Sequence, residues 1–420
     1  MAKEIDDQLV SQAPLIKPQT AFRRLINKLF LIIFGILIGA FMAEIALRIL
    51  GYSYPQFYTS DTWLGYVLRP NIEGWYREEG GSYVRINNEG LRDREHSKTK
   101  PADTFRIAVV GDSYAEALQV PMEAAFWMVL EKKLNECKVF GNKGVEAINF
   151  GVSGYGTAQE LLMLRTRVWQ YSPDLVLLTV TTNNDVTDNV RALKKSNDIP
   201  YFVFQNGKLT LDDSFKNTRA FRARRSALSR LGHWIHDHSR LIQAIRAVNR
   251  KFKYWLDAPR ARTAEANSDS PQNAPPADEP GIENLIYREP KSELWDNAWQ
   301  TTEALIVQMR NEVRAKGAKL IVVTLSNGIQ VYPDARLRES FMNRLGASDL
   351  FYPDKRIKQL CEREHIPVIV LAPRLQEYAD LNRAFLHGFD GKGNGHWNGL
   401  GHQVAGELIA RELCAGLQNR

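Results

Sequence analysis

Cysteine and long hydrophobic runs are both scarce in this sequence, and each scarcity excludes classes of protein. The 420 residues contain three cysteines, and Cys137, Cys361 and Cys414 are too few and too widely spaced for a disulfide framework or a CxxC-type zinc site. A composition of 44% hydrophobic and 25% charged residues excludes a disordered chain, a collagen-like repeat and a polytopic membrane protein. The net charge of +7 permits contact with anionic polymers or lipid headgroups, but alone it does not indicate nucleic acid.

The one long hydrophobic run lies near the N-terminus. Within residues 25–50 the chain is apolar without a break from Leu29 to Ala43. As a helix this segment would be roughly 39 Å long, enough to cross a hydrocarbon core of about 30 Å. Glu44 and Arg48 lie close to its C-terminal end, where they can reach the interface or pair with each other at i,i+4. We therefore predict a single uncleaved transmembrane anchor at 25–50.

Basic residues on one side of this run predict its orientation. They are Arg23, Arg24 and Lys28. The positive-inside rule then places the tail 1–24 in the cytoplasm, and everything after about residue 50 in the periplasm or outside the cell. A cleaved signal peptide is the alternative, but Ala43-Glu44-Ile45 is a poor cleavage site. A buried core helix is disfavoured because the run is apolar on all faces.

Beyond the anchor, short apolar segments rich in Val and Ile alternate with helical patterns. The expected strands are 105–111, 146–152, 175–181, 319–325 and 367–372. The clearest helical pattern runs from Asp296 to Lys316. Continuously apolar strands separated by helices predict a parallel sheet covered on both faces, with ligands bound at the carboxyl ends of the strands.

Polar motifs follow three of these strands, and a fourth lies past the last one. They are GDSYAE (111–116), GVSGYG (151–156), TNND (182–185) and GHWNGLGH (395–402). In residue type, order and context they resemble the four blocks of the SGNH/GDSL hydrolase family, over roughly 105–190 and 295–415. The resemblance implies a three-layer α/β/α flavodoxin-like sheet and a serine ester hydrolase of the membrane-anchored bacterial type, with no metal or organic cofactor.

Carried over to this sequence, the resemblance implies Ser113 as nucleophile and His396 as its general base. It implies an oxyanion hole formed by the Ser113 N–H, Gly154 and Asn184. The chemistry is consistent with these roles, because serine needs a base to remove its proton, and histidine titrates near neutral pH. A serine at a strand-to-helix turn also has helix N–H groups directed at developing negative charge. The sequence lacks GxSxG, which excludes the nucleophile elbow of the α/β-hydrolases.

Each of these residues also has a structural interpretation. Ser113 could cap a helix, and Gly154 and Asn184 could simply form turns. Three neighbouring polar residues are expected to be structural: Asp112 caps the turn, Asp185 holds its loop, and His402 caps or packs against the last helix. Ser153 is the only rival nucleophile near the site, and Ser113 is favoured over it.

The expected position of the triad acid departs from the family pattern. In the family an aspartate usually stands three residues before the histidine, and Gly393 holds that position here. Some relatives use the position two before it, which is Asn394 here. Asp390 is the nearest carboxylate. Three interpretations remain open: Asp390 reaches the imidazole, a backbone carbonyl orients it, or the enzyme is slow or inactive. We favour Asp390.

The segment 190–295 is too long for an ordinary connection. It opens with an expected hairpin at 201–211, whose Asn206-Gly207 is a hairpin-turn signal. Thirteen Lys/Arg against two Asp follow between Lys216 and Arg262, and the tract 263–281 is typical of a flexible linker. The basic helices form either a lid or anionic-headgroup surface, or a solvated helix face. Three histidines there favour no metal site, because no carboxylate or cysteine set accompanies them.

Residues 51–104 are rich in aromatic side chains and lead into a hydrolase-like domain at 105–420. These aromatics pack on the domain or stack on sugar rings. The sequence therefore predicts an extracytoplasmic ester hydrolase, held in the inner membrane by 25–50, that acts on an acyl ester of a glycan or lipid, an O-acetyl ester among the candidates. The alternatives are an O-acyltransferase on a cell-envelope glycan and a degenerate, non-catalytic carbohydrate-binding protein.

Overall fold

Five parallel strands form the centre of the molecule. The computed structural model describes residues 21–265 and 284–418. The strands are β5 (Thr104–Val110), β6 (Gly144–Asn149), β7 (Leu175–Thr181), β10 (Lys319–Leu325) and β11 (Val368–Val370), in the order β11-β10-β7-β5-β6. All four pairings are parallel. Each expected strand is confirmed, with ends that differ by a few residues.

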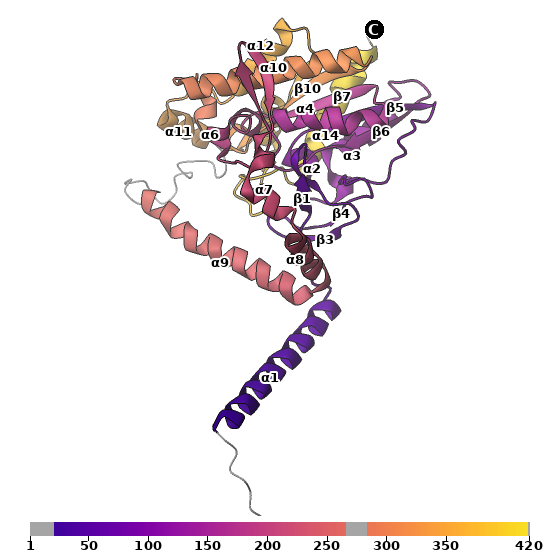
Figure 1. Cartoon of the computed structure of the whole chain (residues 1–420). Coiled ribbons are helices and arrows are strands. Elements are labelled where there is room, and N and C mark those ends of the chain that lie inside the picture. Colours follow the sequence, from indigo (N-terminus) through magenta and orange to yellow (C-terminus); the bar gives the residue numbers. More distant parts are fainter. Residues whose placement is uncertain (1–20, 266–283, 419–420) are drawn as a thin grey trace, which may run out of the picture.

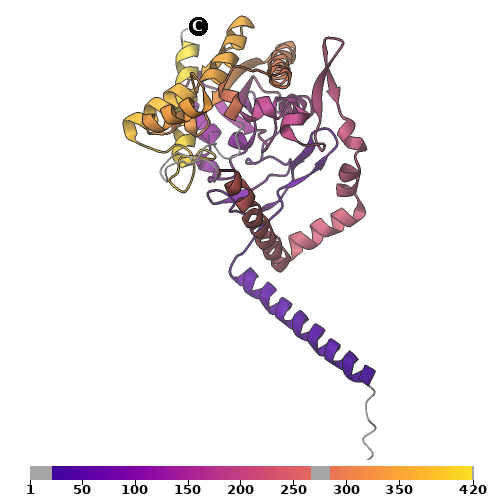
Figure 2. The same ribbon diagram turned by 90° about the vertical axis from the view of Figure 1, so that its left-hand side faces the viewer.

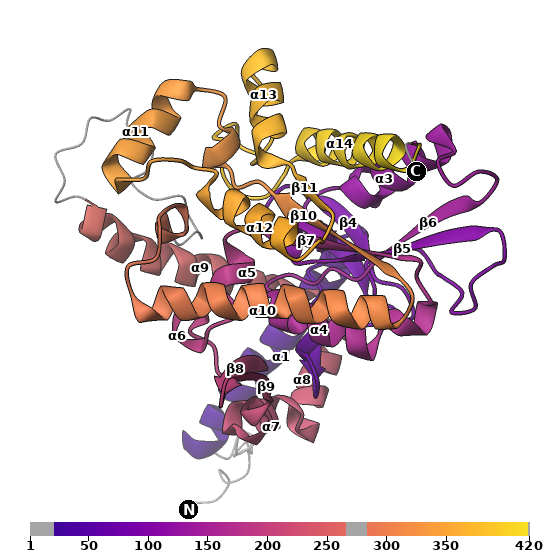
Figure 3. The ribbon, with the colours of Figure 1, turned by 90° about the horizontal axis from the view of Figure 1, so that it is seen from above.

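Helices cover both faces of this sheet, so the fold has three layers (Figure 3). One face carries α4 (Thr157–Thr166), α10 (Glu293–Ala315) and α12 (Tyr352–Arg363), and the other carries α3 (Phe126–Cys137), α13 (Ala372–Asn382) and α14 (Gly399–Gln418). Strand side chains alternate between the two cores: Ala108 and Val110 contact the first, and Ile107 and Val109 the second. Each fully buried large apolar side chain stabilises the fold by about 1.5–3 kcal/mol. The predicted three-layer α/β/α fold is confirmed.

The lead-in and the insertion add smaller elements around the sheet. The lead-in forms two hairpins, β1 (Tyr58–Asp61) with β2 (Gly65–Leu68) and β3 (Glu73–Tyr76) with β4 (Ser82–Arg85). Short helices α2 (Ser113–Glu116), α5 (Asn184–Thr187), α6 (Arg191–Lys194) and α11 (Ala335–Leu345) lie in the connections.

The expected hairpin of the insertion is confirmed as β8 (Tyr201–Gln205) with β9 (Lys208–Asp212). Asn206 and Gly207 both have positive φ, at 50° and 74°, as a two-residue type I′ turn requires. Three helices follow: α7 (Arg219–Arg224), α8 (Ala227–His238) and α9 (Arg240–Glu265). Most of the predicted linker at 263–281 lies outside the described residues.

The N-terminal helix α1 (Ala21–Ile49) extends away from the domain (Figures 1 and 2). Its segment Phe22–Ile49 is long and apolar enough to cross a membrane, and none of its most apolar window is buried. Glu44 and Arg48 form the expected i,i+4 pair, with Arg48 Nε 2.8 Å from Glu44 Oε1. A signal sequence would pass the same test of length and composition.

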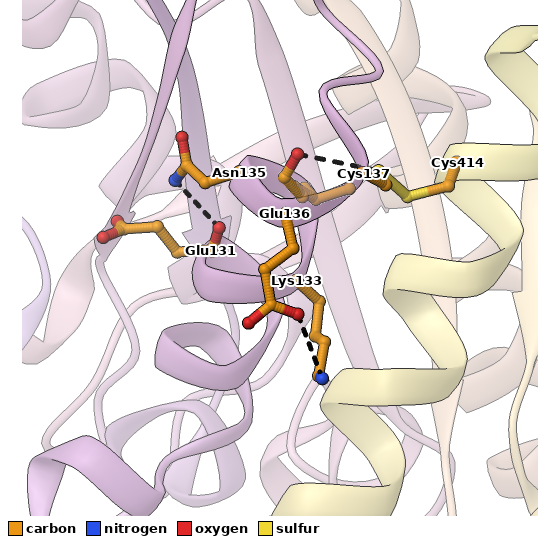
Figure 4. Close-up of a disulfide and its surroundings, with 7 residues drawn as sticks. Glu131, Lys133, Asn135, Glu136, Cys137 and Cys414 are labelled. Carbon is orange, nitrogen blue, oxygen red and sulfur yellow. Dashed lines mark hydrogen bonds and ion pairs between the residues drawn. A yellow bond between two sulfur atoms is a disulfide. The ribbon is translucent and has the colours of Figure 1, made fainter.

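A disulfide joins α3 to α14 on one face of the sheet (Figure 4). Cys137 and Cys414 form it across 277 residues of sequence, while Cys361 is free and buried. The three widely spaced cysteines excluded a framework of several disulfides, and nothing in the sequence predicted which two of them would pair. Spacing along the chain could not reveal this bond, because folding alone brings the ends of α3 and α14 together.

Candidate active site

Ser113 stands at the carboxyl end of β5, which lies between β7 and β6 in the sheet, and it is the first residue of α2. The Asp112 side chain caps this short helix by accepting a hydrogen bond from Tyr114 N at 3.0 Å. Gly111 and Gly151 have no room for a side chain, because a Cβ at Gly111 would lie 2.0 Å from Thr179 Oγ1 and one at Gly151 2.5 Å from Ala115 Cβ. The turn after β5 is therefore packed tightly against its neighbours, which fixes the position of Ser113.

A chain of hydrogen bonds links Ser113 to a histidine and a carboxylate. His396 Nε2 lies 2.8 Å from Ser113 Oγ. On the other side of the ring, His396 Nδ1 lies 2.5 Å from Glu79 Oε2. Glu79 also accepts a second bond through Oε1 from the His396 backbone N–H, at 2.7 Å. The serine, the histidine and the carboxylate thus have the mutual geometry of a catalytic triad.

Glu79 comes from the loop between β3 and β4, in the lead-in rather than in the hydrolase-like domain. The loop is tied to the catalytic turn, because Gly81 N donates to Gln119 O (3.3 Å) and Ser82 Oγ donates to Leu118 O (2.7 Å). Gly80 has φ +67°, and a Cβ there would lie 2.5 Å from Gln119 O. A glycine is therefore required directly after the carboxylate.

Asp390 does not pair with His396, so the favoured assignment of the triad acid is corrected by the geometry. Its carboxylate contacts Lys392, accepting from the backbone N–H at 3.1 Å and lying 3.2 Å from Nζ, and it is exposed to solvent. Glu79 occupies the place beside the imidazole instead. The nearest signal in the sequence is the run Glu78-Glu79-Gly80-Gly81, but no spacing rule relates it to a histidine 317 residues later.

Glu79 and His396 each shift the pKa of the other. Burial disfavours the charged imidazolium, but the hydrogen bond and charge of Glu79 outweigh it and raise the pKa of His396 above its ordinary value. Burial likewise acts to raise the pKa of Glu79, but the hydrogen bonds and charge of His396 lower it overall. The carboxylate is therefore ionised and ready to stabilise a protonated imidazole.

The two expected oxyanion residues lie in loops next to the serine turn. Asn184, at the start of α5, donates from Nδ2 to Asp112 Oδ2 at 3.1 Å, which leaves its second N–H for another acceptor. Gly154 has φ +74°, and a Cβ there would lie 2.8 Å from the Tyr66 hydroxyl. Its loop is held to α2 because Ser153 Oγ donates to Glu116 Oε2. The oxyanion roles remain predictions.

The three residues expected to be structural, and the rival nucleophile Ser153, all have structural contacts. Asp112 caps the turn, and Asp185 Oδ2 accepts from Thr181 N at 2.7 Å. Ser153 donates to the buried carboxylate of Glu116, whose pKa burial raises to about 7. His402 Nδ1 accepts from Phe126 N at 3.3 Å, at the start of α3, and burial lowers its pKa to about 3.

A second histidine supports the catalytic loop and was not identified from the sequence. His387 is fully buried, with Nδ1 2.7 Å from Gly395 O and Nε2 3.0 Å from Ser326 Oγ. Trp397 Nε1 donates to the same Ser326 hydroxyl at 2.9 Å. These bonds hold the residues on both sides of His396, so the ring has little freedom to leave Ser113.

A groove of about 730 Å³ runs between the lead-in and the helices α8 and α9, beside the site. Aromatic side chains of the lead-in and polar groups of the insertion line it, among them Tyr54, Tyr58, Tyr66, Tyr76, Ser153 and Arg246. Tyr58 donates to Glu116 Oε2 at 2.8 Å and Tyr66 donates to Ser153 O at 2.7 Å. Within the described part of the chain, no three His, Cys, Asp or Glu side chains are grouped closely enough to hold a metal ion.

Comparison with known proteins finds likeness in structure only. No protein-family model matches the sequence, and no curated protein matches it. Among the solved structures that resemble the chain, the acetyl xylan esterase AlAXEase has a TM-score of 0.36 and 12% identity, over 73% of this chain and 98% of that one.

Two other solved structures give similar values. An acetylxylan esterase from Geobacillus stearothermophilus, solved as a catalytic mutant, has a TM-score of 0.36 and 12% identity, over 76% of this chain and 96% of that one. A lipolytic protein of the G-D-S-L family from Desulfitobacterium hafniense has a TM-score of 0.33 and 12% identity, over 73% of this chain and 98% of that one. With identities and TM-scores this low, we base the functional conclusion on the geometry of the site.

Proposed function

We propose that the protein is a serine ester hydrolase that acts outside the cytoplasm on an acyl ester of a glycan or lipid. The observation that carries this proposal is the hydrogen-bonded series Ser113–His396–Glu79 at the carboxyl edge of the sheet, with 2.8 Å and 2.5 Å between successive side chains. A serine is an effective nucleophile only when a base can take its proton. This arrangement supplies both the base and the group that orients it.

The reaction follows from these contacts. Ser113 Oγ attacks the acyl carbonyl while His396 Nε2 accepts its proton, and Glu79 stabilises the imidazolium that forms. The Ser113 N–H, Gly154 and Asn184 stabilise the oxyanion. His396 then returns the proton to the leaving alkoxide, which departs and leaves an acyl group on Ser113. Water, deprotonated by His396, attacks the acyl-enzyme. The resulting tetrahedral intermediate collapses, His396 returns the proton to Ser113 Oγ, and the carboxylic acid leaves.

Two alternatives remain: an enzyme that transfers the acyl group to an acceptor other than water, and a binding protein that catalyses no reaction. An O-acyltransferase would use the same acyl-enzyme, with a sugar hydroxyl in place of water. A degenerate binding protein was suggested by the absence of an aspartate before His396. Glu79 removes that reason, because a carboxylate already contacts the imidazole. The groove of about 730 Å³ beside the site has the volume of a small-molecule site and is lined by aromatic side chains, so a glycan and a lipid both remain candidate carriers.

Fluorophosphonate labelling of the full-length protein in detergent tests the proposal. We expect labelling in the wild type, none in Ser113→Ala, and wild-type labelling in Ser153→Ala, because Ser153 contacts Glu116 rather than a histidine. Release of acetate from an acetylated glycan, measured with and without an acceptor glycan, separates hydrolase from transferase. A folded wild type that takes up no probe would favour the binding protein.

We further propose that α1 anchors the enzyme in the membrane and that the catalytic domain lies on the periplasmic or extracellular side. The basic residues before the apolar run support this orientation. The Cys137–Cys414 disulfide also supports it, because such bonds persist mainly in oxidising compartments.

A further inference from the structure

Helix α9 has two opposite faces, one on the domain and one in solvent. Gln243 and Ala247 are buried, and Gln243 Oε1 accepts a hydrogen bond from Tyr54 N at 2.8 Å. Ile245 and Val248 are 50% and 65% exposed. An α-helix has 3.6 residues per turn, so these two side chains lie on the side away from Gln243 and Ala247. The helix thus presents an apolar stripe to its surroundings.

Helix α8 repeats this arrangement. His236 is buried against the domain, whereas Leu228, Leu231 and Trp234 are 77%, 52% and 58% exposed. Two adjacent helices therefore expose large apolar side chains. Contiguous apolar surface of this kind is unfavourable in water and indicates contact with a membrane or another protein. Tryptophan in particular is enriched where an apolar phase meets water, because its ring is apolar and its N–H is polar.

The corner between α8 and α9 is fixed to the end of α1. Glu44 of α1 accepts hydrogen bonds from the first backbone N–H groups of α9, at 3.0 Å from Arg240 N and 2.9 Å from Leu241 N. Arg48 of α1 donates to the carbonyl of His238, the last residue of α8, at 2.6 Å. The two charged residues near the end of the apolar segment thus cap α8 at its C-terminus and α9 at its N-terminus.

This attachment sets the height of the corner above a membrane. Glu44 and Arg48 lie in the last turns of α1, so they are at the interface if α1 spans the bilayer. At that level α8 ends and α9 begins, and both helices are turned aside from the line of α1 (Figures 1 and 2). The apolar stripes are consequently at the depth of the lipid headgroups.

The charge of the two helices suits an anionic surface. Together α8 and α9 contain eight Lys/Arg against two Asp and one Glu. Arg230, Arg246 and Lys251 are exposed beside the apolar stripes. An apolar stripe flanked by basic residues is the pattern of helices that lie in the plane of a bilayer containing anionic lipids.

We propose that α8 and α9 lie on the surface of the membrane that α1 crosses. Leu228, Leu231, Trp234, Ile245 and Val248 insert at the boundary between headgroups and acyl chains, and the flanking basic residues contact anionic phospholipid headgroups. The proposal rests on the membrane-spanning role proposed for α1 and not on the reaction at Ser113. Its consequence is that the groove between α8, α9 and the lead-in opens close to the membrane surface, so the site takes substrates held near that surface.

Spin labels in the full-length protein test this placement. The disulfide and the burial of Cys361 leave no exposed native thiol, so Leu231→Cys and Ile245→Cys can be labelled singly. Each variant is reconstituted into vesicles of equal phosphatidylglycerol and phosphatidylcholine. Both labels should collide more often with oxygen, which concentrates in lipid, than with a water-soluble nickel chelate. Leu381→Cys in α13, 78% exposed and remote from α8, is the matched control and should show the reverse preference (Figure 3).

Three results would overturn the proposal. The first is a label at 231 or 245 as water-exposed as the label at 381. The second is spin–spin broadening at these positions, which would show that a second copy covers the stripes. The third is equal lipid exposure of both labels in pure phosphatidylcholine vesicles, which would remove the role of anionic headgroups. Repeating the measurement in Ser113→Ala separates this outcome from the proposed function, because loss of the nucleophile should leave the label depths unchanged.

Discussion

Glu79 holds His396 through two hydrogen bonds, one to the ring and one to the backbone. The backbone bond fixes the carboxylate relative to the main chain, and the ring bond then fixes the tautomer that presents Nε2 as an acceptor to Ser113. A single carboxylate can therefore orient the base even though the usual position before the histidine is Gly393. In the proposed reaction this residue would act on the proton transfer through His396 alone.

Replacing this carboxylate should change both the rate and its pH dependence. We expect Glu79→Gln to lower kcat/KM for a small ester by about 10³–10⁴-fold, close to the loss caused by Asp-to-Asn in a serine-protease triad. His396 must be neutral to act as a base, and the charge of Glu79 raises its pKa. Removing that charge should lower the pKa of His396, so the acidic limb of the kcat/KM profile should move to lower pH.

Asp390→Asn is the matched control for this measurement. Its carboxylate contacts Lys392 at the surface, so the rate and the pH profile should equal those of the wild type. An acidic limb that stays in place in Glu79→Gln would show that the carboxylate does not act on the histidine. A loss of activity in Asp390→Asn would restore the assignment made from the sequence.

Gly395 makes the close approach of Glu79 possible. Its φ is +95°, and a Cβ there would lie 2.2 Å from Glu79 Oε1. Gly395→Ala should displace the carboxylate and lower kcat by about 10²-fold or more, as small misplacements in catalytic sites do. Gly391→Ala is the control, because Gly391 also has a positive φ, +76°, but a Cβ there would meet open space. Equal activity of the two alanine variants, measured on the same ester, would contradict this account.

At the scale of elements, the sheet and the serine turn could be predicted, whereas the triad acid and the disulfide could not. The strands are continuously apolar and the motifs follow them directly, so short-range pattern is enough to place Ser113 and Asn184 at one edge. Glu79 belongs to a loop between two four-residue strands, and only tertiary packing brings it to His396. Cys137 and Cys414 meet for the same reason, through the packing of α3 on α14.

The disulfide makes a prediction at this scale. It closes a loop across 277 residues that includes four of the five strands of the central sheet, β6, β7, β10 and β11, so it restricts the unfolded chain strongly. The double variant Cys137→Ser/Cys414→Ser should lose about 2–5 kcal/mol of unfolding free energy. Thermal unfolding of the full-length protein followed by circular dichroism would show the lower Tm, and reductant should lower the Tm of the wild type but leave that of the variant unchanged. Titration of three free thiols in the denatured, unreduced wild type would contradict the bond.

For the whole molecule, α1 is both the proposed anchor and part of the folded protein. Glu44 and Arg48 cap α9 and α8, so the C-terminal turns of α1 belong to the structure that carries the groove. A signal peptidase cut near Ala43 would leave Glu44 at a free chain end and disturb these contacts. We therefore expect an N-terminal tag to remain on the membrane-bound protein, which immunoblotting of membrane fractions would show.

The orientation of α1 can be tested separately from its retention. Arg23, Arg24 and Lys28 precede the apolar run, and no Lys or Arg occurs between Arg48 and Arg69. This asymmetry predicts an N-terminus in the cytoplasm and a catalytic domain outside it. Alkaline phosphatase, which needs an oxidising compartment, should be active when fused after Arg420, whereas a green fluorescent protein exported there should stay dark. An inactive phosphatase fusion together with a fluorescent green fluorescent protein fusion would place the domain in the cytoplasm. There the Cys137–Cys414 bond would be reduced, and the proposed extracytoplasmic substrate would be out of reach.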